Sequence, residues 1–208
     1  MQNSQTSNRT RRISLFPDTW FRGLLALLVV MSLASAPAAA QDLINGGALS
    51  GEIAPAQDVD LYKFSANAGE TVTIRVAEDN DTPMSLQAEI LSPFGALVVS
   101  ETGSFVAAIQ FVAATKGTYT LRVSDSNKFG FGTSKYMVHF ALAPGANEHG
   151  LLINGGQVTD SISVGDIDSF TFQFNANQTV FLRVADSGFA SLAPRIAVYA
   201  PFGQLVDS

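Results

Sequence analysis

The 208-residue sequence contains no cysteine. This absence excludes a disulfide framework, a thiolate metal site and a cysteine nucleophile. It also excludes a lipid-anchored N-terminus, because a lipoprotein signal needs a cysteine at the cleavage point. If the chain is exported, its stability must therefore come from a packed core rather than from covalent cross-links.

Charged residues are also scarce, at 14% of the sequence, whereas hydrophobic residues make up 47%. This composition supplies a packed core and is too apolar for a disordered chain. Beyond residue 40 the sequence has 8 basic and 17 acidic residues, a net charge of −9. An acidic chain repels phosphate backbones, which argues against nucleic acid as a partner, and it is compatible with cation binding.

Histidine occurs only twice, as His139 and His149. The alternation of its strand places His139 on an outward face, and His149 lies in a linker. The sequence has no Ser-His-Asp order, no His-Glu-x-x-His and no Gly-x-Ser-x-Gly. A carboxylate pair could hydrolyse glycosides, but no pair here differs from ordinary surface acids. We therefore predict that the protein is not an enzyme.

The first forty residues predict a cleavable signal peptide. A basic stretch ends at Arg22, an apolar run extends from Gly23 to Ala36, and small residues at 38–40 follow. The apolar run of about 14 residues is shorter than the roughly 20 that span a bilayer. We expect cleavage between Ala40 and Gln41 and a secreted or periplasmic mature chain with no membrane attachment. An uncleaved N-terminal membrane anchor is the alternative.

After residue 40 the sequence repeats with a period of about 108 residues. The matched segments are 44–47 with 153–156, 58–64 with 166–172, 71–77 with 179–185 and 93–98 with 201–206. Each unit has the size of a domain rather than of a solenoid repeat. We predict a signal peptide at 1–40, a complete domain at 41–143, a linker at 144–150 and a truncated second copy at 151–208.

The second copy has no counterpart of residues 101–143. A half-sandwich exposes the inner face of one sheet and leaves strand edges unpaired. We therefore expect the sequence to be a fragment or a truncated gene product. Otherwise, the exposed sheet must associate with a partner chain.

Apolar residues alternate with a period of two along the matched segments, as half-buried strands require. Turn residues such as those at 45–47, 68–69 and 93–95 separate these strands. About eight strands fit between Leu43 and Ala143, and no helical pattern follows residue 41. The sequence predicts an all-β, antiparallel, two-sheet, jelly-roll-like β-sandwich. The predicted inward-facing residues are Tyr62, Phe64, Ala66, Val72, Ile74, Val76, Tyr119, Leu121, Val123, Tyr136, Val138, Phe140 and Leu142.

Four motifs in order resemble the bacterial pre-peptidase C-terminal domain family. They are Asp-x-Asp-x-Tyr-x-Phe at 58–64, Ala-Gly-Glu-Thr-Val-Thr-Ile-Arg-Val at 68–76, Pro-x-Gly at 93–95 and Gly-Thr-Tyr-Thr-Leu-Arg-Val at 117–123. The resemblance covers the first copy and the front half of the second. It implies a non-catalytic jelly-roll-type sandwich of the kind appended to secreted peptidases and other exported enzymes. This sequence departs from that architecture because it has no peptidase domain.

The resemblance implies an exported accessory module that adheres to a protein, a polysaccharide or a cell surface. The alternative is a structural or secretion-assisting segment of a larger exported peptidase or other hydrolase. Both interpretations rest on likeness of fold rather than on a site.

Two repeated aspartate pairs, Asp58 with Asp60 and Asp166 with Asp168, are candidate ligands for calcium, the only cofactor the sequence indicates. Residues two apart on a strand face the same side. Calcium needs six to eight oxygens, and one pair supplies at most four. We favour a structural role in which these acids accept backbone N–H bonds at the start of a strand. The acidic loop at 78–81 lacks the glycine and distal glutamate of an EF-hand, and we expect a solvated loop.

Phe129 and Phe131 are candidate binding residues, because they lie in a glycine-spaced loop at 129–132 before the last strand of the first copy. Exposed aromatic side chains there could stack on sugars or dock on a protein. Phe94 and Phe202 occupy equivalent positions between proline and glycine. We expect these two to pack their turns onto the core.

Overall fold

The computed structural model describes residues 39–55, 57–79, 84–127, 133–145, 150–188 and 193–208. All regular structure in these residues is strand, and none of them belongs to a helix able to cross a membrane. The strands, in chain order, are β1 (Gln41–Asp42), β2 (Ala48–Ile53), β3 (Val59–Ala66), β4 (Thr71–Glu78), β5 (Leu86–Leu91), β6 (Leu97–Gly103), β7 (Val106–Val112), β8 (Gly117–Asp125), β9 (Ser134–Ala143), β10 (Leu151–Leu152), β11 (Thr171–Phe172), β12 (Val198–Tyr199) and β13 (Leu205–Asp207).

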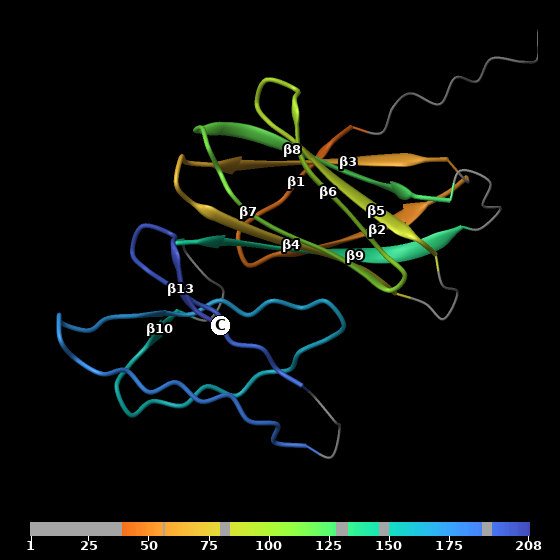
Figure 1. Cartoon of the computed structure of the whole chain (residues 1–208). Coiled ribbons are helices and arrows are strands. Elements are labelled where there is room, and N and C mark those ends of the chain that lie inside the picture. The colour runs from red at the N-terminus through yellow and green to blue at the C-terminus, as the bar shows by residue number, and fades with distance from the viewer. Residues whose placement is uncertain (1–38, 56, 80–83, 128–132, 146–149, 189–192) are drawn as a thin grey trace, which may run out of the picture. The chain divides into compact units, whose positions relative to one another are not determined.

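Strands β1 to β9 build the N-terminal segment, residues 41–143, as two sheets that form separate layers (Figure 1). One sheet has the order β1-β3-β8-β5-β6 and the other the order β2-β9-β4-β7. All neighbours are antiparallel except β1, which pairs in parallel with β3. The predicted two-sheet β-sandwich is confirmed, and the eight strands expected between residues 43 and 143 are β2 to β9.

The inner faces of the two sheets enclose one apolar core, as the alternation predicts. Every predicted inward-facing residue is buried except Leu142, which is partly buried and packs against the core. Phe64, Tyr119 and Phe140 form its aromatic centre, with ring centroids 5.5 Å and 5.0 Å from Phe64 to the other two. Each fully buried large apolar side chain contributes about 1.5–3 kcal/mol, so this core is what stabilises the N-terminal segment.

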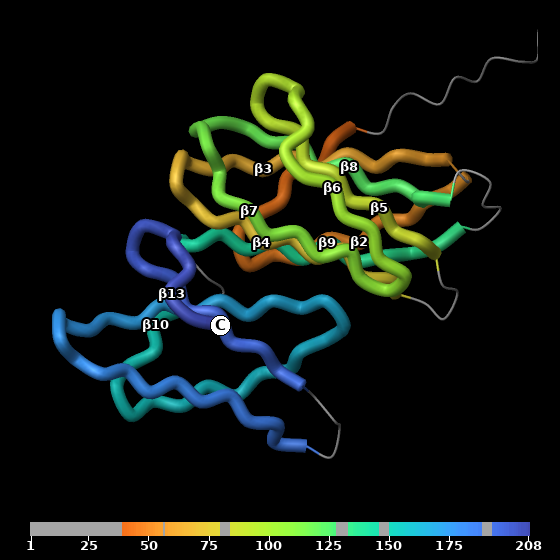
Figure 2. Tube along the Cα trace, viewed as in Figure 1, coloured from red at the N-terminus to blue at the C-terminus, as the bar shows by residue number. Residues whose placement is uncertain are grey.

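The C-terminal segment, residues 151–208, contains much less regular structure. Strand β10 pairs in parallel with β11, and β12 pairs antiparallel with β13. Figure 2 shows the long connections between these short strands in blue tones. Gly203 is the only buried residue among those the structure describes in this segment.

The turns of the two segments carry the same hydrogen bonds at matched positions. The N–H of Gly95 donates to the carbonyl of Ser92 at 2.9 Å, and that of Gly203 donates to Ala200 at 2.9 Å. Both glycines have φ near +80°, at 80° and 84°, a region that favours glycine. The Pro-Phe-Gly sequence therefore closes the same turn in both segments.

Candidate functional site

The first aspartate of each pair closes the loop before its strand. Oδ1 of Asp58 accepts the N–H of Val59 at 2.9 Å, and Oδ1 of Asp166 accepts the N–H of Ile167 at 2.9 Å. Oδ2 of Asp58 also accepts the N–H of Ala54 at 3.5 Å. These are the local side-chain to backbone bonds typical of aspartate before a strand.

The second aspartate of the first pair, Asp60, accepts a hydrogen bond from the hydroxyl of Tyr136 at 2.5 Å. Burial raises the pKa of Asp60, the bond from Tyr136 lowers it, and the neighbouring charge of Asp58 raises it again. Asp168 is partly buried. Within the described residues no group of three or more His, Asp or Glu side chains is placed to hold a metal ion. Calcium binding by either pair stays a prediction.

His139 lies on the side of its sheet that faces away from the core, yet only 5% of it is exposed. Its Nδ1 lies 3.3 Å from Oδ1 of Asp166, and Nη1 of Arg75 donates to the Asp166 carbonyl at 3.4 Å. Burial lowers the pKa of His139, the carboxylate of Asp166 opposes this, and the charge of Arg75 adds to the lowering. A buried imidazole of this kind is poorly placed to meet a substrate, and His149 lies outside the described residues.

The expectation that Phe94 and Phe202 pack onto the core is wrong, because these side chains are 84% and 87% exposed. The turn around Phe94 is closed by its own polar groups. Oγ of Ser92 accepts the N–H groups of Phe94 and Ala96 at 3.3 Å and 3.1 Å, and the N–H of Ser92 donates to the Ala96 carbonyl at 2.7 Å. The turn therefore needs no aromatic anchor, and its phenylalanine projects into solvent. Phe129 and Phe131 lie outside the described residues, and their binding role stays a prediction.

Exposed apolar side chains of the N-terminal sandwich are concentrated in the stretch that contains β6 and β7. Seven large hydrophobic side chains are exposed in its described residues, and five of them lie between positions 94 and 112. We call these five the β6–β7 edge: Phe94, Leu97, Val98, Phe105 and Val112. Strand β6 is one of the two outermost strands of its sheet, β7 is one of the two outermost strands of the other sheet, and β6 and β7 are neighbours in space. Isolated exposed apolar residues are ordinary, but a series of them along the outermost strands of two sheets is typical of an interaction surface.

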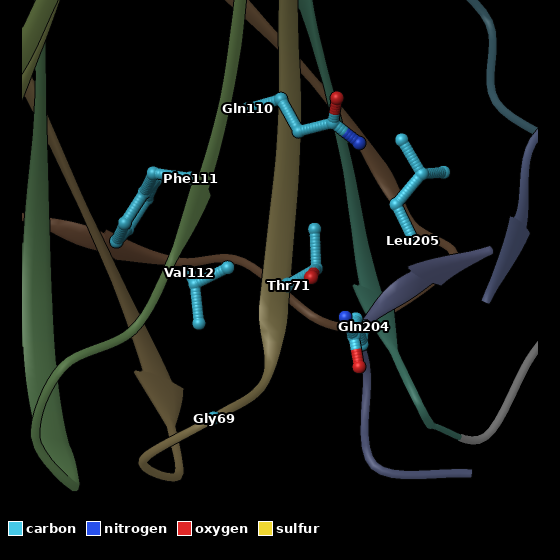
Figure 3. A pocket seen from close by; sticks show the side chains of 7 residues that line it. All are labelled: Gly69, Thr71, Gln110, Phe111, Val112, Gln204 and Leu205. Carbon is cyan, nitrogen blue, oxygen red and sulfur yellow. The ribbon is translucent and has the colours of Figure 1, made fainter. Parts of the chain in front are cut away.

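An open hollow of about 430 Å³ adjoins the end of β7 (Figure 3). The side chains of Gln110 and Leu205 lie on its two sides. Two hydrogen bonds link its walls, from Oγ1 of Thr71 to the Gly203 carbonyl and from Nε2 of Gln110 to the hydroxyl of Tyr199. Residues 38–208 form one compact unit, and these bonds lie within it. The hollow is lined by Gly69, Thr71, Gln110, Phe111, Val112, Gln204 and Leu205.

Sequence reasoning missed the β6–β7 edge, although one signal for it is present. Leu97, Val98 and Val99 are three consecutive apolar residues on a strand. Successive side chains of a strand point to opposite faces, so such a run cannot be buried on one face alone. Phe105 carries no comparable signal, because its exposure depends on the short turn between β6 and β7.

Comparisons with known proteins find similar structures but no match by sequence. No protein family and no curated protein matches the sequence. The pre-peptidase C-terminal domain of a collagenase from Bacillus anthracis is similar in structure, with a TM-score of 0.42 and 15% identity over 50% of this chain and 97% of that chain. A periplasmic inhibitor of g-type lysozyme from Aeromonas hydrophila has a TM-score of 0.41 and 14% identity over 50% of this chain and 95% of its own. The corresponding inhibitor from Salmonella Typhimurium has a TM-score of 0.36 and 20% identity over 49% and 96%.

Proposed function

We propose that the chain is a non-catalytic, exported binding module that adheres to another protein through the β6–β7 edge. The observation that carries this proposal is that five of the seven exposed large hydrophobic side chains lie on β6 and β7 or in the turns next to these strands. Their removal from water on binding would be favourable at about 25 cal/mol for each Å² buried.

A protein fits this surface better than a sugar or a membrane does. Outermost strands offer unpaired backbone N–H and carbonyl groups, to which an extended chain can add as a further strand. The side chains on the edge are phenylalanine, leucine and valine, which provide apolar contact but no hydrogen bonds to sugar hydroxyls. The charge of −9 beyond residue 40 disfavours anionic lipid and nucleic acid and favours a basic partner.

Two features support a module that binds and does not catalyse. The imidazole of His139 is covered and paired with Asp166, so this residue is badly placed for acid–base chemistry. Asp58 and Asp60 are engaged by backbone and by Tyr136, as structural acids are. The motifs at residues 58–123 resemble those of pre-peptidase C-terminal domains, and this resemblance supports an accessory role. The order of basic, apolar and small residues at 1–40 supports export with cleavage after Ala40.

Site-directed photo-crosslinking in the cells that export the protein tests the proposal. The photoreactive residue p-benzoylphenylalanine replaces Phe105 in one variant and Phe94 in a second. A control variant carries it in place of Lys63, an exposed residue on β3 of the same sandwich. We expect protein adducts of defined mass from the two edge positions and none from the control position.

Three results would contradict the proposal. The first is a set of equal adducts from all three positions, which would mean unspecific contact. The second is the absence of protein adducts together with retention of the chain on purified cell-wall polysaccharide, which would favour a sugar ligand. The third is an adduct pattern centred on Lys63, which would place the interface on another face.

A further inference from the structure

The dipeptide Asn-Gly occurs twice in the sequence, as Asn45-Gly46 and as Asn154-Gly155. In this dipeptide the side-chain amide of asparagine is open to attack by the main-chain nitrogen of the next residue. Glycine favours the attack because it has no Cβ to shield that nitrogen. The two dipeptides share this chemistry, so a difference in their reactivity must come from the fold.

Both dipeptides lie at the centre of the same kind of turn. The N–H of Gly47 donates to the Ile44 carbonyl at 2.8 Å, and the N–H of Gly156 donates to the Ile153 carbonyl at 2.8 Å. The glycine of each dipeptide has a positive φ, 80° in the first turn and 76° in the second. The turns themselves therefore do not distinguish the two asparagines.

Strand β9 holds both reacting groups of the first dipeptide. Oδ1 of Asn45 accepts the N–H of Leu142 at 2.6 Å. The N–H of Gly46, which carries the nitrogen that would attack, donates to the Phe140 carbonyl at 3.0 Å. The side chain must rotate and the nitrogen must lose its proton before they react, and both events require these bonds to open. The fold thus protects Asn45.

The second dipeptide is exposed to solvent, and so is the glycine that follows it. Within the part of the chain that the structure describes, neither the side-chain amide of Asn154 nor the N–H of Gly155 has a hydrogen-bond partner. The amide carbon and the nitrogen can therefore approach each other without any opening of the fold. Water, which the later step consumes, reaches the turn freely.

We propose that Asn154 is a site of covalent self-modification, at which the turn converts the asparagine to aspartate and isoaspartate. The Gly155 nitrogen attacks Cγ of Asn154, so that an N–Cγ bond forms and the Cγ–Nδ2 bond breaks. Ammonia leaves with the proton of the Gly155 N–H, and a cyclic succinimide remains. Water then opens the ring at one of its two carbonyls. The sum is hydrolysis of an amide, and no oxidant or reductant takes part.

The products differ from asparagine in charge and in backbone. Each product adds a negative charge to a chain whose net charge beyond residue 40 is already −9. Isoaspartate also places the Cβ of residue 154 in the main chain, which lengthens the turn that Gly156 closes on Ile153. The modification therefore alters the connection that follows β10.

Peptide mapping of the purified chain measures both asparagines in one sample. The chain is incubated at mildly alkaline pH, which favours loss of the proton from the attacking nitrogen, and its proteolytic fragments are followed by tandem mass spectrometry. In the folded chain, conversion at Asn154 should be at least about tenfold faster than at Asn45. In urea the bonds to β9 are lost, so the two sites should react at the same rate. Asn154 should react there about as fast as it does in the folded chain.

Asn154→Gln is the matched control, because its longer side chain disfavours closure of the ring. A methyltransferase specific for isoaspartate should label the aged chain more strongly than the aged variant. Equal rates at the two asparagines of the folded chain would overturn the proposal. So would a rate at Asn154 that rises about tenfold in urea, because the fold would then protect this turn as well.

Discussion

The hydroxyl of Tyr136 on β9 donates to Oδ2 of Asp60 on β3 at 2.5 Å, and this bond joins the two sheets. The hydroxyls of Tyr62 and Tyr136 lie 2.9 Å apart. Because the proton of Tyr136 is directed to the carboxylate, Tyr62 must donate in that second bond. Burial raises the pKa of both tyrosines above the ordinary value of 10.0, so both are protonated at neutral pH.

This chain of hydrogen bonds predicts that Tyr136→Phe is more costly than Tyr62→Phe. Loss of the Tyr136 hydroxyl leaves Asp60 without its donor and Tyr62 without its acceptor, and we expect the free energy of unfolding to fall by about 1–3 kcal/mol. Urea unfolding at neutral pH measures both variants. Tyr119→Phe is the control, because its hydroxyl makes a 2.8 Å bond to the Thr115 carbonyl and its loss should cost about 1 kcal/mol. Equal costs for Tyr136→Phe and Tyr119→Phe would show that the bond between the sheets stabilises the fold no more than the local bond of Tyr119 does.

Gly51 on β2 leaves room for the same pair of hydroxyls. A Cβ at this position would lie 2.4 Å from the hydroxyl oxygens of both Tyr62 and Tyr136. Gly51→Ala should therefore lower the free energy of unfolding by about 1–3 kcal/mol through overpacking. Ser50→Ala, on the exposed face of the same strand, should change it by less than about 0.5 kcal/mol. A Gly51→Ala variant as stable as the Ser50→Ala control would contradict this packing.

The buried imidazole of His139 makes the free energy of unfolding decrease in mild acid. Its folded-state pKa is lowered from the ordinary value of 6.5, so below that pH the unfolded state binds more protons than the folded state. The free energy of unfolding should therefore decrease as the pH falls from about 6.5 towards the lowered pKa. The groups that face the imidazole are the carboxylate of Asp166, which opposes the lowering, and the cation of Arg75, which adds to it.

The variant His139→Gln isolates this contribution. Urea unfolding between pH 7.5 and pH 5 should show a smaller loss of stability in the variant than in the unmodified chain. Asp60 acts with the opposite sign, because its folded-state pKa is raised and its contribution to stability is lost as the pH rises through that value. An equally steep loss of stability in His139→Gln would show that other groups cause the acid sensitivity.

The contrast between two phenylalanines gives a further prediction. Phe64 lies in the core, whereas Phe94 projects from its turn. Phe64→Ala should cost about 3–5 kcal/mol because it removes a buried ring and leaves a cavity. Phe94→Ala should change the free energy of unfolding by less than about 0.5 kcal/mol. A cost above 1 kcal/mol for Phe94→Ala would mean that its turn packs on the core after all.

The sequence predicts the core well because alternation is a local property. Val72, Ile74 and Val76 share a face whatever their strand pairs with, and the same holds for Tyr119 and Leu121. Their burial follows once any second sheet covers that face. The eight strands of the sandwich could be predicted for the same reason.

Features that depend on distant residues could not be predicted in this way. The exposure of Leu97 and Val112 follows from the outermost positions of β6 and β7, which are decided by strand order across the whole segment. The burial of His139 depends on the loop around Gly165, which lies against the outward face of β9. The expectation that Phe94 packs onto the core is wrong because the hydrogen bonds of Ser92 close its turn without an apolar anchor. Alternation within a strand does not show which strand is outermost, which loop covers its outward face or how a turn is closed.

The affinity of the crosslinked partner for variants of the β6–β7 edge tests the proposed binding most directly. We predict that the triple variant Phe94→Ser, Val98→Ser, Phe105→Ser binds the partner at least about tenfold more weakly than the unmodified chain, because a few large side chains carry most of the energy of an interface. The control Lys63→Ser should keep full affinity, and both variants should unfold at the same urea concentration. Unchanged affinity in the triple variant, with its fold intact, would contradict binding through this edge.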